Sequence, residues 1–355
     1  MNVIVLTPMM GGADGISEMT RQWVRVLESR AGRDVAALDV WSLDDPARPG
    51  AAGAGTRFRT ARGGRMRFAS FALREATHAA ADTLVIVMHL QLLPVALPLA
   101  WRGARLMVIL MGIEAWTPLR PLERIAFRRA WKVTAISTHT VVRFRRENPT
   151  LAHVPITVCR PGAPLMAHPS DEHIAGPYAL IVGRMSVSER YKGHDVLIEQ
   201  WPRVRRAVPG ARLVIAGDGD DADRLRQKAG AVCGDAIAFV GRISDARLAA
   251  LYRDAAFFVM PSTDEGFGLV YLEAMGASTP CIAAHGAPEE IIHDGVDGVI
   301  VDAANGDELL DAMTRLFVDQ PLRTRMAAAA AERVRREFSP AALAARVCDV
   351  LDLPC

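Results

Sequence analysis

Short apolar runs that alternate with amphipathic stretches constrain this fold most strongly. In the first half of the chain they cover residues 3–6, 35–38, 84–88, 106–110 and 133–136. A second series covers residues 179–182, 213–216, 237–240, 257–260, 281–284 and 299–301. Strands that alternate with helices are typical of parallel βαβ units. Because each series opens with a strand that runs into a glycine-rich turn, we expect an α/β fold with two Rossmann-like, doubly wound parallel-sheet domains.

The length and composition fit two domains of ordinary size. The chain has 355 residues, of which half are hydrophobic and 23% charged, as in globular proteins. Proline and polar residues are dense over 161–177, which is the expected linker. We therefore expect a first domain over residues 1–165 and a second over residues 166–338.

Charge and cysteine content narrow the possible partners and compartment. The net charge of +2 is too small to indicate nucleic acid as a partner. Five cysteines are scattered without CxxC spacing, which is typical of reduced thiols in the cytoplasm. The first ten residues lack a basic leader and predict a strand rather than a secretory signal. The apolar run 83–101 contains His89, Gln91 and two prolines, so it predicts a strand and a short helix rather than a membrane span.

Two glutamates frame the most informative stretch, residues 261–280. Glu265 and Glu273 lie eight positions apart after an apolar strand, and Gly266 and Gly268 follow the first glutamate. If a helix begins near Gly268, Glu265 stays in the loop and Glu273 lies within the helix. The N–H groups of residues 267–270 then point out of the helix start, where an anion is commonly held. The stretch predicts a site for a polar, anionic ligand.

Other glycine-rich turns offer further phosphate sites, each with a simpler alternative. Gly11 and Gly12 follow the first strand, although a tight strand-to-helix turn explains two glycines equally well. Gly183-Arg184 ends the first strand of the second half, and Lys192 follows eight residues after Arg184. Two cations at a strand end can neutralise a departing diphosphate, or they can be ordinary surface charges.

The acidic run 217–223 superficially offers a dinucleotide turn or a metal pair. It lacks the third glycine of the dinucleotide fingerprint. We expect its aspartates to cap a helix that starts near Asp220 rather than to bind a metal. In the first half, His89 and Glu114 each follow a strand and are candidates for an acceptor pocket, against the alternatives of a packed histidine and a surface charge.

A basic segment stands apart from this pattern. Between residues 46 and 74 there is no acidic residue, while arginines and phenylalanines accumulate among glycines: Arg57, Arg59, Arg62, Arg65, Arg67 and Arg74 with Phe58, Phe68 and Phe71. One interpretation is a solvated, flexible connection. The other is a basic, partly apolar lip that meets anionic lipid or a diphosphate-bearing acceptor.

Taken together, these residues resemble the retaining, metal-independent glycosyltransferases of family 4, also described as group 1, which have the GT-B fold. The second half carries the resemblance in the family's order: Gly183-Arg184, Tyr191-Lys192-Gly193-His194-Asp195, Gly217-Asp218-Gly219, Phe239-Val240-Gly241, Pro261-Ser262, Glu265-Gly266-Phe267-Gly268 and Glu273-Ala274-Met275. Glu265 and Glu273 match the family's E-x7-E motif. The first half matches only through Gly11-Gly12 and Gly112-Ile113-Glu114.

The resemblance implies a cleft between two domains and a role for each matched residue. Glu265 and the amides of Gly266, Phe267 and Gly268 would hold the hydroxyls of a donor sugar. Glu273 would bind the ribose, and the backbone around Ile243 would border the base. The amides of Leu269 and Val270, with Arg184, Lys192, Gly11, Gly12, Gly183 and Gly217, would surround the diphosphate. Residues 339–355 would form a helix that crosses back to the first domain.

This sequence departs from the family pattern at three places. Met111 stands where many members have a histidine that would contact the reacting centre. After Met275 the family usually has Ala-x-Gly-x-Pro, whereas here the order is Gly276-Ala277-Ser278-Thr279-Pro280. The loop between Arg184 and Lys192 is longer than the commonest form, which should alter the acceptor side of the cleft.

The predicted function is therefore retaining, metal-independent sugar transfer. The donor would be a UDP- or GDP-linked sugar serving as co-substrate without a cofactor, and the acceptor a saccharide or lipid-linked saccharide. We expect a cytoplasmic protein that contacts the inner face of the plasma membrane, builds polysaccharide or glycolipid, and does not bind nucleic acid. A non-catalytic nucleotide-sugar-binding protein and an NAD-dependent oxidoreductase are the alternatives, although the oxidoreductase leaves Glu265, Glu273, Arg184 and Lys192 unexplained.

Overall fold

The chain forms two compact units. The computed structural model describes residues 1–77, 82–174 and 176–354. Residues Met1–Gly162 and Pro340–Cys355 make up the first unit, and Ala163–Ser339 the second. The chain thus passes out of the first unit after Gly162 and returns to it at Pro340, close to the boundaries expected at residues 165 and 338.

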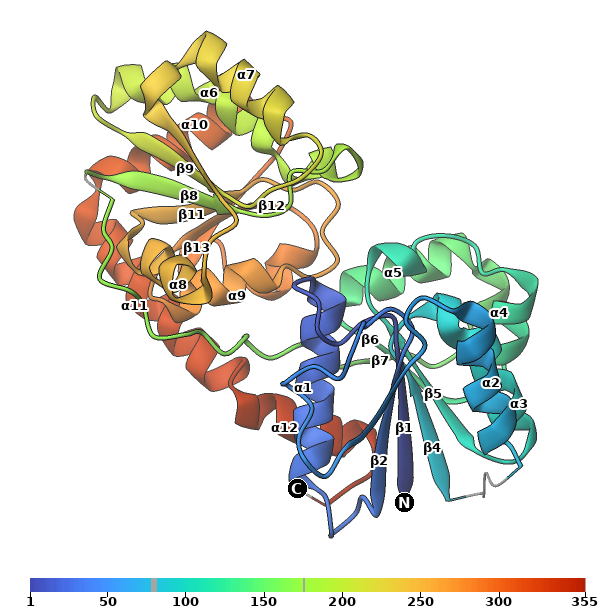
Figure 1. Ribbon diagram of the computed structural model, residues 1–355. Helices are drawn as coiled ribbons and strands as arrows, with labels where there is room; N and C mark the ends of the chain where they lie inside the picture. Colours follow the sequence, from blue (N-terminus) through green and yellow to red (C-terminus); the bar gives the residue numbers. More distant parts are fainter. Residues whose placement is uncertain (78–81, 175, 355) are drawn as a thin grey trace. The chain divides into compact units, whose positions relative to one another are not determined.

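The first unit is a seven-stranded parallel sheet covered by helices on both faces (Figure 1). Its strands lie in the order β3-β2-β1-β4-β5-β6-β7. They are β1 (Asn2–Thr7), β2 (Ala37–Ser42), β3 (Arg57–Thr60), β4 (Thr83–Val87), β5 (Arg105–Leu110), β6 (Ala130–Ala135) and β7 (Thr157–Val158). One face carries α2 (Arg65–Glu75), α3 (Leu93–Trp101) and α4 (Pro121–Phe127), and the other carries α1 (Gly15–Ser29) and α12 (Pro340–Val350). Helix α5 (Thr138–Glu147) follows β6, and the 3₁₀ turns are η1 (Leu90–Leu92), η2 (Ile113–Ala115) and η3 (Pro149–Leu151).

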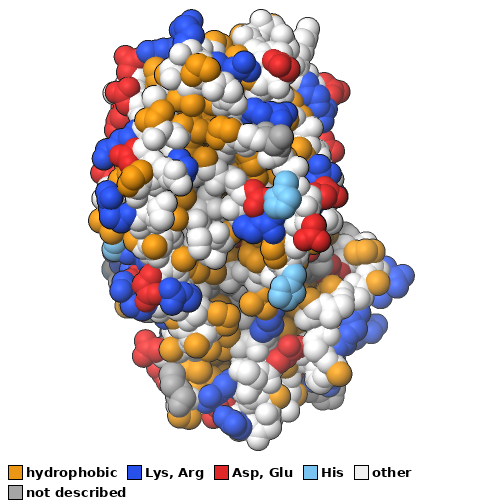
Figure 2. Space-filling view, turned by 90° about the vertical axis from the view of Figure 1, so that its left-hand side faces the viewer, with side chains coloured by type: hydrophobic (Ala, Val, Ile, Leu, Met, Phe, Trp, Pro, Cys, Tyr) orange, Lys and Arg blue, Asp and Glu red, His pale blue; other side chains and the backbone are white. Residues whose placement is uncertain are grey.

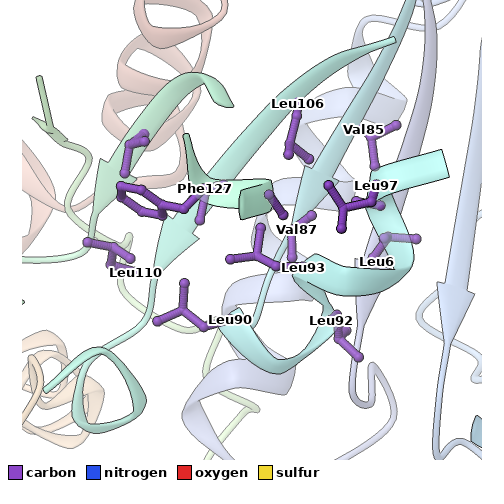
Figure 3. Close-up of a cluster of buried hydrophobic side chains, with 14 of the residues drawn as sticks. Leu6, Val85, Val87, Leu90, Leu92, Leu93, Leu97, Leu106, Leu110 and Phe127 are labelled. Atoms are coloured by element: carbon purple, nitrogen blue, oxygen red, sulfur yellow. The ribbon is translucent and has the colours of Figure 1, made fainter. Parts of the chain in front are cut away.

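The core of this unit lies between the central strands and α3 (Figure 3). Strand β4 is buried over its whole length, as parallel strands covered on both faces are. The side chains that meet there are almost all aliphatic and less than 5% exposed: Leu6, Val85, Val87, Leu90, Leu92, Leu93, Leu97, Leu106, Leu110 and Phe127. Burying each such side chain stabilises the fold by about 1.5–3 kcal/mol.

The second unit repeats this architecture with a six-stranded parallel sheet. Its strands lie in the order β10-β9-β8-β11-β12-β13. They are β8 (Tyr178–Val182), β9 (Arg212–Ala216), β10 (Ile237–Gly241), β11 (Phe257–Met260), β12 (Cys281–Ala284) and β13 (Gly298–Val301). Helices α6 (His194–Ala207), α7 (Ala222–Val232) and α10 (Gly306–Val318) cover one face, and α8 (Asp245–Asp254), α9 (Leu269–Gly276) and α11 (Gln320–Glu337) the other (Figure 1). The 3₁₀ turns are η4 (Val187–Lys192), η5 (Gly234–Ala236) and η6 (Ala287–Glu290). The two doubly wound parallel sheets confirm the predicted fold class.

The strand order of each unit reverses at one place. Numbered within its own unit, each sheet reads 3-2-1-4-5-6 over its first six strands, so the reversal lies between β1 and β4 and between β8 and β11. Open α/β sheets bind ligands beyond the carboxyl ends of the two strands that flank such a reversal. These two strand pairs therefore mark the candidate sites.

The basic segment is not a flexible connection, so that interpretation is wrong. It forms the edge strand β3 and helix α2. Arg57 pairs with Asp39 at 2.6 Å, and Arg59 pairs with Glu75 at 3.2 Å. The run 83–101 forms β4, η1 and α3, as expected. Among the described helices, none has the length and apolar character needed to cross a membrane. Basic and acidic side chains are interspersed on the face shown in Figure 2.

Candidate functional site

Two strand ends meet at the reversal of the second sheet. Gly183 and Arg184 follow β8, and the loop 261–268 follows the neighbouring β11. Helix α9 begins at Leu269, so Glu265 lies in the loop and Glu273 within the helix, as predicted. The E-x7-E stretch thus lies at the crevice where an α/β sheet holds its ligand.

Glycines bring the backbone segments of this crevice close together. A methyl group on Gly217, whose φ is +133°, would lie 2.0 Å from the carbonyl oxygen of Gly183. A methyl group on Gly183 would lie 3.3 Å from Lys192 Cδ, so the lysine side chain passes over that glycine. On Gly193, with φ +89°, it would lie 2.7 Å from Pro261 Cγ. Close approach therefore explains these glycines, and a contact between Gly183 or Gly217 and a ligand stays a prediction.

The two predicted cations share one carboxylate. Lys192 Nζ lies 2.8 Å from Glu189 Oε2, and the Arg184 guanidinium pairs with the other oxygen of Glu189. The Glu189 side chain is only 11% exposed, whereas that of Arg184 is 66% exposed. Sequence reasoning missed Glu189, because its place between the cations depends on how η4 shapes the long loop.

Glu265 is half-buried beside Lys192. Burial raises the pKa of its carboxyl above the usual value, while the charge of Lys192 and hydrogen bonds from the backbone N–H groups of Gly266 and Phe267 lower it. Two of the amides expected to contact a sugar thus support the Glu265 carboxylate in this structure. Such bonds fix its orientation toward a ligand.

The start of α9 is open to an anion. Its N-cap is Gly268, with φ +98°, and no side chain caps it among the described residues. The N–H groups of Leu269 and Val270 belong to this first turn, whose donors lack partners within the helix. Further along, Tyr252 on α8 donates a hydrogen bond of 2.8 Å to Glu273 Oε2. Tyr252 was also missed, because it reads as one more apolar position of α8.

The aspartates after β9 do not cap a helix, and that prediction is wrong. Helix α7 begins at Ala222, and Asp221, at its N-cap, makes no side-chain capping bond. Asp221 instead accepts two hydrogen bonds from Arg190, at 3.0 and 2.8 Å, and Asp220 accepts one of 3.0 Å from the Val187 N–H. These acids anchor the loop that carries Glu189 and Lys192.

Besides Glu189 Oε2, which Lys192 faces, two buried polar atoms beside the crevice lack a hydrogen-bond partner among the described residues, His194 Nε2 and Ser262 Oγ. Burial, reinforced by the charge of Lys192, lowers the pKa of His194 to about 4, so its ring is neutral at physiological pH. Both residues belong to the quoted motifs without an assigned role. Ile243 follows β10, at the edge of the sheet, and its place beside a base stays a prediction.

In the first unit, hydrogen bonds with Asp45 and Arg21 hold the backbone of the turn after β1. Asp45 accepts hydrogen bonds from the N–H groups of Met10, at 2.7 Å, and Gly11, at 2.9 Å. Arg21 donates to the carbonyl oxygens of Met10 and Gly12, each at 2.7 Å. The Gly11 amide thus serves the turn itself in this structure, and the predicted diphosphate contacts of Gly11 and Gly12 remain untested.

The two acceptor candidates follow neighbouring strands, β4 and β5. His89 Nδ1 accepts a hydrogen bond of 3.2 Å from the Gln91 N–H and caps η1, and burial lowers the pKa of the ring. Glu114 Oε1 accepts a hydrogen bond of 2.6 Å from the Met111 N–H. Burial raises the pKa of Glu114 to about 7, against the lowering effect of the backbone hydrogen bonds. Glu114 is therefore not an ordinary surface charge.

The described residues contain no group of three or more histidine, cysteine, aspartate or glutamate side chains placed to hold a metal ion. The crevice of the second unit instead brings together the cations Arg184 and Lys192 and the carboxylates Glu189 and Glu265, beside the start of α9. This arrangement suits an organic anion that also carries hydroxyl groups.

Comparison with known proteins identifies the family. The sequence profile described as Glycosyl transferases group 1 matches residues 176–319. The chain is 32% identical over 271 residues to a GDP-mannose-dependent alpha-(1-6)-phosphatidylinositol monomannoside mannosyltransferase of Mycobacterium tuberculosis, covering 70% of each protein. The chain belongs to the group 1 glycosyltransferases.

Other relatives and solved structures agree with this assignment. Our group 1 glycosyltransferase is 37% identical over 163 residues to a phosphatidyl-myo-inositol mannosyltransferase of Mycobacterium leprae, covering 45% of this chain and 42% of that one. A sucrose-phosphate synthase of Thermosynechococcus elongatus superposes with a TM-score of 0.81 at 21% identity, over 99% of this chain and 98% of that one. Anabaena HepE in complex with UDP and glucose superposes with a TM-score of 0.76 at 18% identity, over 99% of each chain. The fold is therefore the GT-B fold.

Proposed function

We propose that this glycosyltransferase moves a sugar from a nucleotide-diphosphate sugar to a saccharide or lipid-linked acceptor with retention of the anomeric configuration. One observation carries the proposal: Arg184, Lys192, Glu265 and the open start of α9 lie around the reversal between β8 and β11. In this proposal the cations and the amides of α9 bind the diphosphate, Glu265 binds the sugar, and Glu273, oriented by Tyr252, binds the ribose.

The proposed chemistry is one exchange of bonds at the anomeric carbon. The bond from that carbon to the diphosphate oxygen breaks, and the acceptor oxygen bonds to the carbon from the same face. The acceptor proton passes to the departing diphosphate. Arg184 and Lys192 stabilise the charge that builds on this leaving group. Glu265, which accepts hydrogen bonds from two amides and interacts electrostatically with Lys192, orients the sugar and is not the base.

GDP-mannose and a lipid-linked acceptor are the first pair to test, since the Mycobacterium tuberculosis relative is named for a GDP-mannose-dependent enzyme acting on phosphatidylinositol monomannoside. A thermal-shift screen with GDP, UDP, ADP and their sugars measures the donor preference. A ligand at a hundred times its Kd raises stability by about 2.7 kcal/mol. Donor-dependent transfer, with the anomeric configuration of the product read by NMR, supports the proposal.

Three outcomes count against it. An inverted product removes the retaining mechanism. Tight nucleotide binding without turnover of any donor and acceptor pair indicates a non-catalytic binding protein. Binding of reduced nicotinamide cofactor, read by its fluorescence, indicates an oxidoreductase.

We further propose that transfer needs no metal ion. The cations Arg184 and Lys192 supply the positive charge that a divalent ion would otherwise bring to the diphosphate. Activity in excess EDTA should equal activity in buffer, and complete loss that Mg²⁺ or Mn²⁺ restores would contradict the proposal and return attention to the aspartates near Asp218.

For location, we propose that the protein works in the cytoplasm at the inner face of the membrane, with α2 resting on anionic lipid. This helix exposes apolar and basic side chains together, because Met66 is 86% and Leu73 61% exposed while Arg65 and Arg67 are also exposed. Basic amphipathic helices bind anionic interfaces through both features.

Charge reversal tests this surface. Arg62, Arg65 and Arg67 changed to Glu should abolish sedimentation with vesicles that contain anionic phospholipid. Reversing three exposed arginines of the second unit, Arg206, Arg335 and Arg336, should leave it intact. Equal binding by the two triple variants removes the proposal.

A further inference from the structure

Glu189 occupies the cations that the proposed function assigns to the diphosphate. Each of its carboxylate oxygens faces one cation, Arg184 on one side and Lys192 at 2.8 Å on the other. Two oxygens of one phosphate group could face the same two cations in the same way. Glu189 lies outside the E-x7-E stretch, and the mechanism above gives it no role.

The charges around Lys192 determine how readily a diphosphate can bind beside Glu189. Two carboxylates act on Lys192, because Glu189 pairs with it at 2.8 Å and Glu265 interacts with it electrostatically. With both carboxylates ionised, the two cations and two carboxylates sum to no net charge. A diphosphate that enters beside Glu189 adds negative charge next to a half-buried carboxylate, and like charges at such distances repel.

The loop around Glu189 is anchored by other residues, so release of the two cations requires movement only of the Glu189 side chain. Asp220 holds the Val187 N–H, Asp221 holds Arg190, and the Tyr191 carbonyl accepts a hydrogen bond of 3.0 Å from the Thr263 N–H. Glu189 itself leaves helical geometry, with φ −121° and ψ 25°. Rotation of its side-chain torsions into another staggered rotamer would free both cations without moving these anchors.

We propose that Glu189 is a resident counter-anion that the donor's diphosphate displaces from Arg184 and Lys192. The inference rests on the proposed function of this crevice. Simple anions compete poorly, since they must displace Glu189 with phosphate contacts alone. A nucleotide sugar also makes contacts through its base, ribose and sugar, and these additional contacts allow it to displace Glu189. After transfer, Glu189 returns to the cations and favours release of the nucleoside diphosphate.

Calorimetric titration of the Glu189→Gln variant tests the displacement. The amide keeps the size of the side chain and removes its charge. GDP, UDP and inorganic pyrophosphate are titrated into wild type and variant, with guanosine and uridine as ligands that lack phosphate. The variant should bind pyrophosphate and the preferred nucleoside diphosphate about fivefold more tightly, the size expected from removing one nearby like charge. Nucleoside affinity should stay unchanged, and product inhibition of transfer should strengthen.

Asp223→Asn is the matched control, because Asp223 is 98% exposed on the same unit and pairs only with Arg226 among the interactions described. It changes net charge equally and should leave all affinities unchanged. A Glu189→Ala variant repeats the test with the side chain removed, and circular dichroism verifies that each variant is folded.

Equal or weaker diphosphate binding by both Glu189 variants overturns the inference, since it shows that Glu189 positions the cations instead of competing for them. Failure of the proposed function gives a different result. In that case wild type binds none of the nucleotides, and Lys192→Ala changes nothing. If wild type binds GDP or UDP and Lys192→Ala weakens that binding, the function stands whatever the Glu189 variants show.

Discussion

Lys192 is the residue on which the proposed chemistry depends most directly. It passes over Gly183 and is paired with Glu189 at 2.8 Å. Lys192→Ala should raise the barrier to transfer by about 2–4 kcal/mol, as loss of other preorganised charge stabilisers does. Steady-state rates with saturating donor measure the change.

Arg206→Ala, which removes an exposed cation of the same unit, should leave the rate unchanged. A rate loss below about tenfold for Lys192→Ala, or about 1.4 kcal/mol, would make Lys192 an ordinary surface charge.

Glu114 gives the first unit a pH-dependent stability. Its pKa is about 7 in the folded protein against 4.5 ordinarily, so the folded state holds a proton that the unfolded state releases between those values. The free energy of unfolding therefore falls as pH rises from about 4.5 to 7. Relative to Glu114→Gln, wild type should lose about 1–3 kcal/mol between pH 5 and pH 8, measured by urea denaturation at each pH. A parallel pH dependence of the two proteins would contradict this.

At these single positions, sequence reasoning found the residues but not their partners. Glu265, Arg184 and Lys192 follow from the types of residue at strand ends. Glu189 and Tyr252 do not, because an i, i+3 pair within an irregular turn and a tyrosine on another helix depend on side-chain directions. A carboxylate three residues before Lys192 was the available signal.

Among the elements, the end of α9 carries a local strain. The N–H groups of Ser278 and Thr279 donate to the carbonyls of Met275 and Ala274, at 3.0 and 2.9 Å, in a Schellman motif. Ser278 takes the left-handed position, with φ +62°. The family usually has glycine at the position of Ser278. The serine therefore replaces glycine where the left-handed backbone most favours glycine.

Ser278→Gly should therefore stabilise the second unit by about 1 kcal/mol, since a side chain in left-handed geometry costs roughly 1–2 kcal/mol. Thermal denaturation measures the change. Ser70→Gly, within α2, should instead destabilise by about 0.5 kcal/mol. A lower melting temperature for Ser278→Gly would show that the serine side chain contributes more than the strain costs.

The elements themselves were largely predictable, because buried parallel strands are continuous apolar runs. The six runs of the second half match β8 to β13 closely. Strand β3 was not predicted, since an edge strand needs only one apolar face and its arginines find partners in Asp39 and Glu75. The prediction for the aspartates after β9 failed for a related reason. Arg190, Arg224 and the Val187 amide bind Asp221 and Asp220, so these carboxylates do not cap the nearby helix start.

For the molecule as a whole, α12 is part of the first unit's core. Leu343 and Val347 are at most 3% exposed, Lys132 Nζ donates to the Val350 carbonyl at 2.7 Å, and Arg346 Nε donates to the Arg160 carbonyl at 3.1 Å. Leu343→Ala should destabilise the first unit by about 2–5 kcal/mol and leave the second unchanged.

Intrinsic fluorescence reads this selectively, because five of the six tryptophans lie in the first unit and only Trp201 in the second. The urea midpoint of the fluorescence transition should fall. Leu122→Ala, at a site 57% exposed on α4, should shift it little. Equal shifts for both variants would contradict a core role for α12.

The return of the chain at Pro340 also sets an order of events during synthesis. A ribosome that adds roughly 5–20 residues per second completes the second unit before it makes α12. The unit that emerges first is thus completed after the second one, and the apolar surface that α12 covers stays uncovered on the nascent chain until that helix has been made. Chaperone binding to stalled chains should accordingly concentrate on residues 1–162 rather than on the sheet made after them.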